Sequence, residues 1–131
     1  MSWDSYVTNL TASSDGIKKA AIVSLGDSSI WARSEDFKAT EAELKTLTAM
    51  FRDDLKTAAK TGFDLEGTHY VVTRAELPLL FGKKGEFGVF AIKTKLTVVV
   101  VVYVGDNNTS KGQECRTAVE KMGDYLVTNG Y

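Results

Sequence analysis

The chain has 131 residues, 44% of them hydrophobic and 25% charged, and its formal net charge is −1. This composition is typical of one globular domain (residues 1–131), and it excludes a strong overall attraction to nucleic acid or to an anionic membrane. The single cysteine, Cys115, excludes an internal disulfide, and no apolar run is long enough for a transmembrane helix. We therefore expect a cytoplasmic protein.

The first part of the chain predicts a helix followed by a β-hairpin. Apolar residues recur at helical spacing over Trp3–Ala12, which indicates an amphipathic helix. The apolar run 17–25 predicts a strand, and the Gly-Asp-Ser-Ser stretch at 26–29 is typical of a turn. Ile30–Arg33 should then return as the second strand of the hairpin.

A second helix is predicted after residue 40. Thr40 and Glu43 have the spacing of a capping box, in which each side chain satisfies the backbone N–H of the other residue. An apolar stripe continues from there to about Lys60, either unbroken or interrupted near Asp53-Asp54. Gly62 is placed to end this helix.

The second half of the chain predicts five strands, and the last of them organises the fold. It is apolar on both sides from Leu96 to Val104, interrupted only by Thr97, whereas a strand with one wet face would alternate. We therefore expect a central strand that is covered on both faces. The other strands are expected at 63–65, 68–74, 77–81 (with Pro78 at its start or on an edge) and 87–93, with a turn at 82–85.

A last helix is predicted from the capping-box pair Ser110 and Gln113 to a stop at Gly130, with Cys115 buried on its apolar stripe. The order is thus helix, two strands, helix, five strands, helix. Only Thr94-Lys95 separate the last two strands, so we expect that pair to be an antiparallel hairpin. Because the central strand also needs cover on both faces, we predict an α+β fold with an antiparallel sheet. The N- and C-terminal helices should lie on one face and the internal helix on the other.

Residue patterns that would indicate catalysis or a metal site are weak. His69 is the only histidine, and nothing in the sequence sets it against a nucleophile. One Cys and one His do not make a zinc site. Asp53-Asp54, Glu41 and Glu43 are interpreted as solvated helix charges. The glycine-rich run 82–88 lacks the Gly-Lys-Ser/Thr ending of a phosphate loop. We predict no catalytic residues, metal or cofactor.

Aromatic residues near both ends of the chain are the informative ones. Trp3 and Tyr6 share a face of the first helix, Tyr125 lies on the last helix, and Trp31 and Tyr131 complete the set. These rings could simply belong to the core. Alternatively, they could form an exposed groove that suits a proline-rich segment, whose extended helix is preformed and loses little entropy on binding.

Motifs along the whole chain resemble the profilin family. The start, Met-Ser-Trp-Asp-Ser-Tyr-Val, resembles the family's N-terminal signature, and Lys19-Ala20-Ala21-Ile22-Val23 with Ser29-Ile30-Trp31-Ala32 resembles its first hairpin. Gly67-Thr68-His69-Tyr70, the turn 81–85, the stretch 119–126 and the closing Gly130-Tyr131 are similar to the middle and end. Profilins are small cytosolic proteins that bind monomeric actin, so the resemblance implies a non-enzymatic adaptor with a profilin-like fold.

The resemblance also implies two separate binding surfaces. The family's groove for proline-rich ligands corresponds here to Trp3, Tyr6, Trp31, Tyr125, Leu126 and Tyr131. The family's actin surface corresponds approximately to Val72, Arg74, Lys83, Lys84, Glu86, Lys111, Gly112, Gln113, Arg116, Thr117 and Glu120. Profilins also bind phosphoinositide head groups through basic residues, and the lysines of the second half are candidates.

Two functions follow as expectations. The first is an actin-monomer-binding, cytoskeleton-associated adaptor that regulates polymerisation and binds proline-rich proteins, with no nucleic-acid partner. The alternative is a phosphoinositide-binding or membrane-surface module with weak or no actin binding, which rests on eight basic against six acidic residues after residue 66. A small hydrolase is disfavoured because no nucleophile–base pair is visible.

Overall fold

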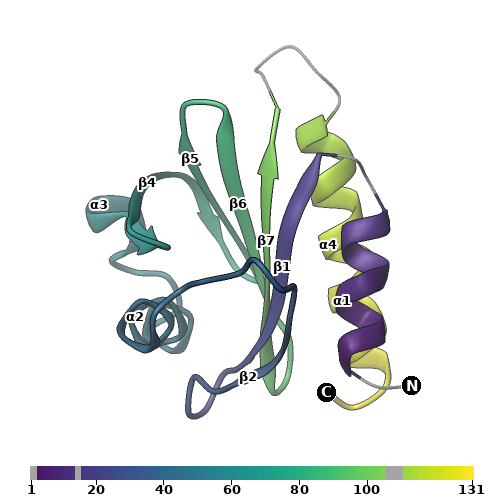
Figure 1. Ribbon diagram of the computed structural model, residues 1–131. Helices are drawn as coiled ribbons and strands as arrows, with labels where there is room; N and C mark the ends of the chain where they lie inside the picture. Colours follow the sequence, from purple (N-terminus) through teal and green to yellow (C-terminus); the bar gives the residue numbers. More distant parts are fainter. Residues whose placement is uncertain (1–2, 14–15, 106–110) are drawn as a thin grey trace.

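The computed structural model describes residues 3–13, 16–105 and 111–131, although not the side chains of Ala59 and Lys111. A curled antiparallel sheet separates two helical layers (Figure 1). The helices are α1 (Trp3–Ala12), α2 (Glu41–Arg52), α3 (Ala58–Thr61) and α4 (Lys111–Thr128). The strands are β1 (Ile17–Ser24), β2 (Ile30–Arg33), β3 (Phe63–Leu65), β4 (Thr68–Glu76), β5 (Leu79–Lys84), β6 (Phe87–Lys93) and β7 (Thr97–Val104).

The seven strands run in the order β2-β1-β7-β6-β5-β4-β3, and every neighbouring pair is antiparallel. β7 lies between β1 and β6, and it is buried along nearly its whole length. The prediction of a central strand covered on both faces is therefore confirmed. Its predicted start is not, because Leu96 belongs to the β6–β7 turn and its side chain is 49% exposed.

Each face of the sheet carries its own apolar core, and the strand residues alternate between them. On one face α1 and α4 cover a core that includes Leu10, Val99 and Leu126. On the other face α2 and α3 cover a core that includes Phe51 and Val100. Figure 1 shows this division, with α1 and α4 packed side by side on one face. The predicted α+β architecture is confirmed.

The internal helical segment begins as the sequence predicts and is then interrupted. The Thr40 side chain accepts from the Glu43 N–H and Glu43 Oε1 accepts from the Thr40 N–H at 2.9 Å, which completes the capping box. α2 ends at Arg52, because Asp54 and Leu55 follow with φ angles of +56° and +60°. The break turns the chain so that Leu55 becomes buried, and α3 follows as a separate turn.

The interpretation of Glu43 as a solvated helix charge is wrong. Its carboxylate also accepts the backbone N–H groups of Glu66 (2.9 Å) and Gly67 (2.8 Å), so it joins α2 to the β3–β4 turn. Partial burial opposes ionisation, but these N–H donors together hold the pKa of the carboxyl below its usual value of 4.5. Glu66 in turn pairs with Lys19 on β1 at 3.0 Å.

The predicted turn at 82–85 is misplaced, because β5 continues through Gly82 to Lys84. A Cβ at Gly82 would lie 2.6 Å from the Phe63 ring, so the missing side chain provides packing space inside a strand. The turn follows at Gly85, which has φ +59°. Pro78 lies in the β4–β5 turn, just before β5.

The last helix begins at Lys111, so Ser110 of the predicted capping box lies outside the described residues. Cys115 is fully buried in the core beneath α1 and α4, as predicted from its place on the apolar stripe. No helix in the described part of the chain is long and apolar enough to cross a bilayer.

Candidate functional site

Aromatic rings from three distant segments meet at one end of the α1–α4 layer. Trp3 on α1 is central: its ring centroid lies 4.9 Å from that of Trp31 on β2 and 4.9 Å from that of Tyr131. Tyr6 follows at 5.4 Å and in turn meets Tyr125 of α4 at 5.5 Å. All four of these contacts are edge-on or tilted, which is the geometry that aromatic quadrupoles favour. The structure therefore brings together the five predicted rings.

Trp3, Trp31, Tyr131 and Leu96 line a hollow of about 470 Å³. Tyr125 and Tyr131 remain 42% and 40% exposed, whereas the two tryptophans are half-buried. We call this surface the aromatic groove; its residues are Trp3, Tyr6, Trp31, Leu96, Tyr125 and Tyr131. Leu96 was not among the predicted groove residues, because the continuous apolar run placed it in the buried strand.

Two of the predicted groove residues are more buried than the others. Tyr6 is only 8% exposed. The hydrogen bond between the Tyr6 and Tyr125 side chains raises the pKa of Tyr6 above its ordinary value of 10.0, and burial adds to this increase. Leu126 is fully buried in the core beneath α1 and α4. It takes part through its backbone, because its carbonyl accepts the Tyr131 N–H at 2.8 Å.

The backbone of Tyr131 also forms hydrogen bonds with the β6–β7 turn. Its oxygen accepts the Leu96 N–H and, at 2.9 Å, the hydroxyl of Thr94. The Thr94 hydroxyl lies 2.6 Å from the hydroxyl of Thr97, and both side chains are buried. These bonds hold the Tyr131 ring beside Trp3 without help from a ligand, so the groove is preorganised.

The α4 members of the predicted actin-binding set lie along two separate hollows. Arg74 of β4 joins Arg116, Glu120 and Asp124 of α4 around a hollow at the β4–β5 turn. Within it Arg116 Nε donates to Glu120 Oε1 at 2.7 Å, and Arg74 pairs with a neighbouring acid, Glu76, at 3.1 Å. The i, i+4 spacing of the three α4 residues places them on one stripe of the helix.

Other members of the set lie elsewhere. Gln113 and Thr117 line a separate hollow against the end of α1, with Ser13 and Lys121. Gly112 is close to the Tyr103 ring, where a Cβ would lie 3.2 Å from the hydroxyl oxygen. Lys84 is exposed at the end of β5 and Glu86 in the following turn, whereas Lys83 is half-buried. The side chain of Lys111 lies outside the described residues.

A β-bulge separates Val72 from Arg74. Val72 pairs with Gly82 and packs against the core beneath α2, whereas Arg74 pairs with Phe81, which packs against the core beneath α4. The two therefore lie on opposite faces of the sheet. Val71 is 61% exposed and pairs with Lys83, so it is the valine on the Arg74 side that sequence reasoning missed.

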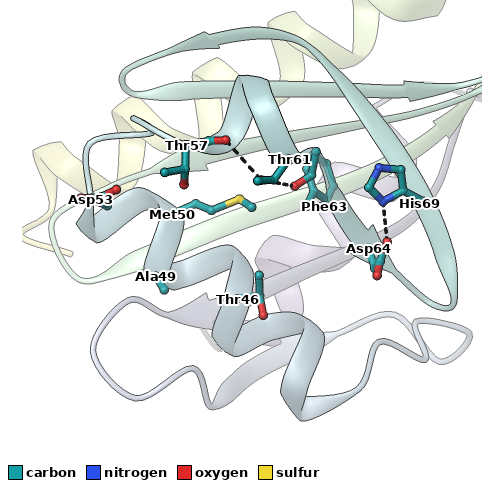
Figure 2. Close-up of a pocket in the computed structure, with 10 residues that line it drawn as sticks. Thr46, Ala49, Met50, Asp53, Thr57, Thr61, Phe63, Asp64 and His69 are labelled. Atoms are coloured by element: carbon teal, nitrogen blue, oxygen red, sulfur yellow. Dashed lines mark hydrogen bonds and ion pairs between the residues drawn. The ribbon is translucent and has the colours of Figure 1, made fainter.

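A further hollow of about 580 Å³ lies on the opposite face of the sheet, between α2, α3 and β3 (Figure 2). His69 stands at its edge with Nδ1 2.7 Å from Asp64 Oδ1, and both side chains are more than half exposed. The Thr61 hydroxyl points away from the imidazole toward the Thr57 and Gly62 carbonyls. Among the lining residues, therefore, the His–Asp pair is not joined to a nucleophile.

A seven-stranded antiparallel sheet whose terminal helices present a preorganised aromatic groove defines a small α+β binding domain. The sequence model of the family described as Profilin matches residues 1–131. The chain is 48% identical over 132 residues to profilin-1 of Caenorhabditis elegans, and the alignment covers 98% of each chain. It belongs to the profilin family.

Solved structures agree with this assignment. Acanthamoeba castellanii profilin IB matches with a TM-score of 0.87 and 37% sequence identity over 99% of this chain and all of that one. Two more distant structures share the fold. Mouse profilin IIa in complex with a double repeat from the FH1 domain of mDia1 has 23% identity and a TM-score of 0.75, with all of both chains covered. A LokiProfilin2/rabbit actin complex has 14% identity and a TM-score of 0.78, with 98% of both chains covered.

Proposed function

We propose that this profilin is a non-enzymatic adaptor that binds monomeric actin on one surface and a proline-rich segment in the aromatic groove. The observation that carries the proposal is the groove itself, in which Trp3 contacts three other aromatic rings while remaining half-buried. Membership of the profilin family supports it, as do family members solved with actin and with an FH1 repeat.

The groove has the properties that a polyproline II helix requires. Such a helix has no internal hydrogen bonds and presents pyrrolidine rings on three faces, so flat aromatic rings can pack between them. Tyr125 and Tyr131 are exposed residues of the groove, and a tyrosine hydroxyl can donate a hydrogen bond to a ligand carbonyl. The predicted set of Trp3, Tyr6, Trp31, Tyr125, Leu126 and Tyr131 is thus proposed here with Leu96 added and with Leu126 as a backbone support.

The proposed actin surface centres on the hollow that Arg74, Arg116 and Glu120 line between the β4–β5 turn and α4. Lys83, with Val71 beside it in register, extends this surface along β5. Charged groups around an apolar floor (Leu79 and Ile92) mainly determine association rate and specificity. Val72, which packs toward the other face, is left out of the proposed contact.

Two single substitutions test the separation of the surfaces. Trp3→Ala removes the ring on which the groove is centred, and loss of such an aromatic anchor should weaken decaproline binding by about tenfold or more while actin binding is retained. Arg116→Glu should do the reverse. Peptide binding is measured by tryptophan fluorescence, which comes from Trp31 in the Trp3→Ala variant. Binding of monomeric actin is measured by a pull-down on beads that carry the immobilised variant. Equal damage to both ligands by both variants would contradict the two-surface assignment.

The alternative function, a phosphoinositide-binding surface with weak or no actin binding, stays a prediction. It would be favoured by salt-sensitive binding to vesicles that contain anionic phosphoinositides together with absent actin binding. A cytoplasmic, cytoskeleton-associated location is part of the proposed function and is tested by imaging the tagged protein together with filamentous actin.

A further inference from the structure

We propose that the aromatic groove continues into a second, basic hollow that binds an acidic residue flanking the proline-rich segment. This inference rests on the proposed function, because the acidic residue belongs to the same ligand. The second hollow, of about 370 Å³, is lined by Ser24, Leu25, Gly26, Trp31, Arg52, Lys95 and Leu96. We call it the basic hollow.

The two hollows adjoin one another, because Trp31 and Leu96 line both of them. A ligand that continues past these two side chains from the rings of Trp3 and Tyr131 would enter the basic hollow. A polyproline II segment advances about 3.1 Å per residue in a straight line. In the proposed binding mode, a residue immediately before or after the proline run therefore lies at the basic hollow.

The two charged residues that line the basic hollow, Arg52 and Lys95, are both positive. Lys95 is exposed in the β6–β7 turn, and within the described part of the chain its ammonium makes no ion pair or hydrogen bond. Arg52 is fixed, because its Nη1 donates to the carbonyls of Leu25 at 2.8 Å and Gly26 at 2.9 Å. Among the residues that the structure describes, no acidic side chain lines the hollow. Charge complementarity thus favours a carboxylate.

The neighbouring acid, Asp27, forms no ion pair with either cation within the described part of the chain. Asp27 lies in the β1–β2 turn, and its Oδ1 accepts the Ser29 hydroxyl at 2.7 Å and the Ser29 N–H at 3.0 Å. The same bonds lower the pKa of Asp27, the hydroxyl contributing most, so the carboxylate is stabilised inside its own turn. Two cations are also fewer than the four to eight that typically mark a lipid-binding cluster, which favours a peptide over a membrane.

The test compares capped decaproline peptides that carry two aspartates at the N-terminal flank, two at the C-terminal flank, or two asparagines at the same positions. Binding to the full chain is followed by tryptophan fluorescence. An exposed ion pair contributes little, so we expect one aspartate peptide to bind about two- to fivefold more tightly than its asparagine counterpart. The ratio should approach one at about 1 M salt, where the screening length falls to about 3 Å.

The decisive variant is Lys95→Glu, which should abolish or invert the aspartate-to-asparagine ratio. Its matched control is Lys60→Glu on α3, an exposed lysine that lines neither hollow, which should keep the ratio. Equal binding of both peptide types to the unmodified protein, or a ratio that Lys95→Glu leaves unchanged, would overturn the proposal.

Two further arms separate the possible failures. If no peptide binds at all, the proposed function of the groove fails along with the extension, whereas tight binding without a preference for aspartate refutes the extension alone. Phosphatidylcholine vesicles with and without a phosphatidylinositol bisphosphate give the lipid comparison. Loss of vesicle binding in Lys95→Glu, with no effect on the peptide ratio, would assign the basic hollow to a membrane and reject the proposal.

Discussion

Replacing Thr94 with valine should destabilise the protein and weaken proline-rich binding together, because one hydroxyl supports both the β6–β7 turn and Tyr131. Thr94 Oγ1 donates to the Tyr131 oxygen at 2.9 Å, accepts the Thr97 N–H at 3.1 Å and lies 2.6 Å from Thr97 Oγ1. Valine keeps the side-chain shape and removes these contacts, together with the 3.3 Å bond from Thr94 Oγ1 to the Thr97 carbonyl. Because Thr97 is fully buried, its N–H would lose its partner at a cost of about 1–3 kcal/mol.

The hydrogen bond to Tyr131 contributes a further net value of about 0.5–1.5 kcal/mol, so the free energy of unfolding should fall by about 2–4 kcal/mol in total. Urea unfolding followed by tryptophan fluorescence measures it. With an m-value of about 2 kcal/mol/M, the middle of the usual range, the midpoint should fall by roughly 1–2 M at unchanged m. Decaproline should also bind more weakly, since the backbone of Tyr131 then retains its bonds to Leu96 and Leu126 alone.

Thr97→Val is the matched control. It removes only the contact between the two hydroxyls and leaves Thr94 free to accept the Thr97 N–H and to donate to Tyr131, so the expected cost is about 1 kcal/mol. If the two valine variants unfold at the same urea concentration, or if Thr94→Val binds decaproline like the unmodified protein, the reasoning about this hydroxyl is refuted.

Three further substitutions test other contacts. Glu43→Gln should lower the free energy of unfolding above about pH 4.5, because the folded protein holds the pKa of the Glu43 carboxyl below its usual value. The difference in stability between the two proteins should therefore shrink as the pH falls through the folded pKa. Urea midpoints measured between pH 3 and 7 check this. Gly88→Ala should destabilise by about 1–3 kcal/mol, because a Cβ there would lie 2.3 Å from the Tyr103 ring; an unchanged melting temperature would contradict this. Tyr125→Phe should bring the pKa of Tyr6 down toward 10.0, since the hydrogen bond that raises it is lost, and absorbance at alkaline pH measures the change.

Elements whose pattern follows from burial were predictable from the sequence. β7 is apolar on both sides because Val99 faces the core beneath α4 and Val100 the core beneath α2, and that alone required helices on both faces. α1, β2 and β3 have the predicted boundaries because their periodicity ends in polar or glycine-rich turns. The aromatic set could be proposed from the two chain ends, although only the tertiary structure brings Trp31 to them.

Features that depend on single backbone angles or on register were not predictable. The positive φ angles at Asp54 and Leu55 have no glycine or asparagine to announce them, so the sequence left the break in the internal helix open. The bulge after Val72 reverses the alternation of side chains within β4, which placed Arg74 on the opposite face. Gly82 was interpreted as a turn residue, although it serves close packing against Phe63.

The geometry of α4 bears on whether the two proposed ligands can bind at once. Arg116, Glu120 and Asp124 follow one stripe of the helix toward the β4–β5 turn, whereas Tyr125 is rotated from Asp124 by about 100° and meets Tyr6 of α1. The helix thus keeps the two proposed surfaces on different sides, and no residue belongs to both. Decaproline in excess should therefore leave monomeric actin bound to the immobilised protein; displacement of actin by the peptide would show that the surfaces overlap.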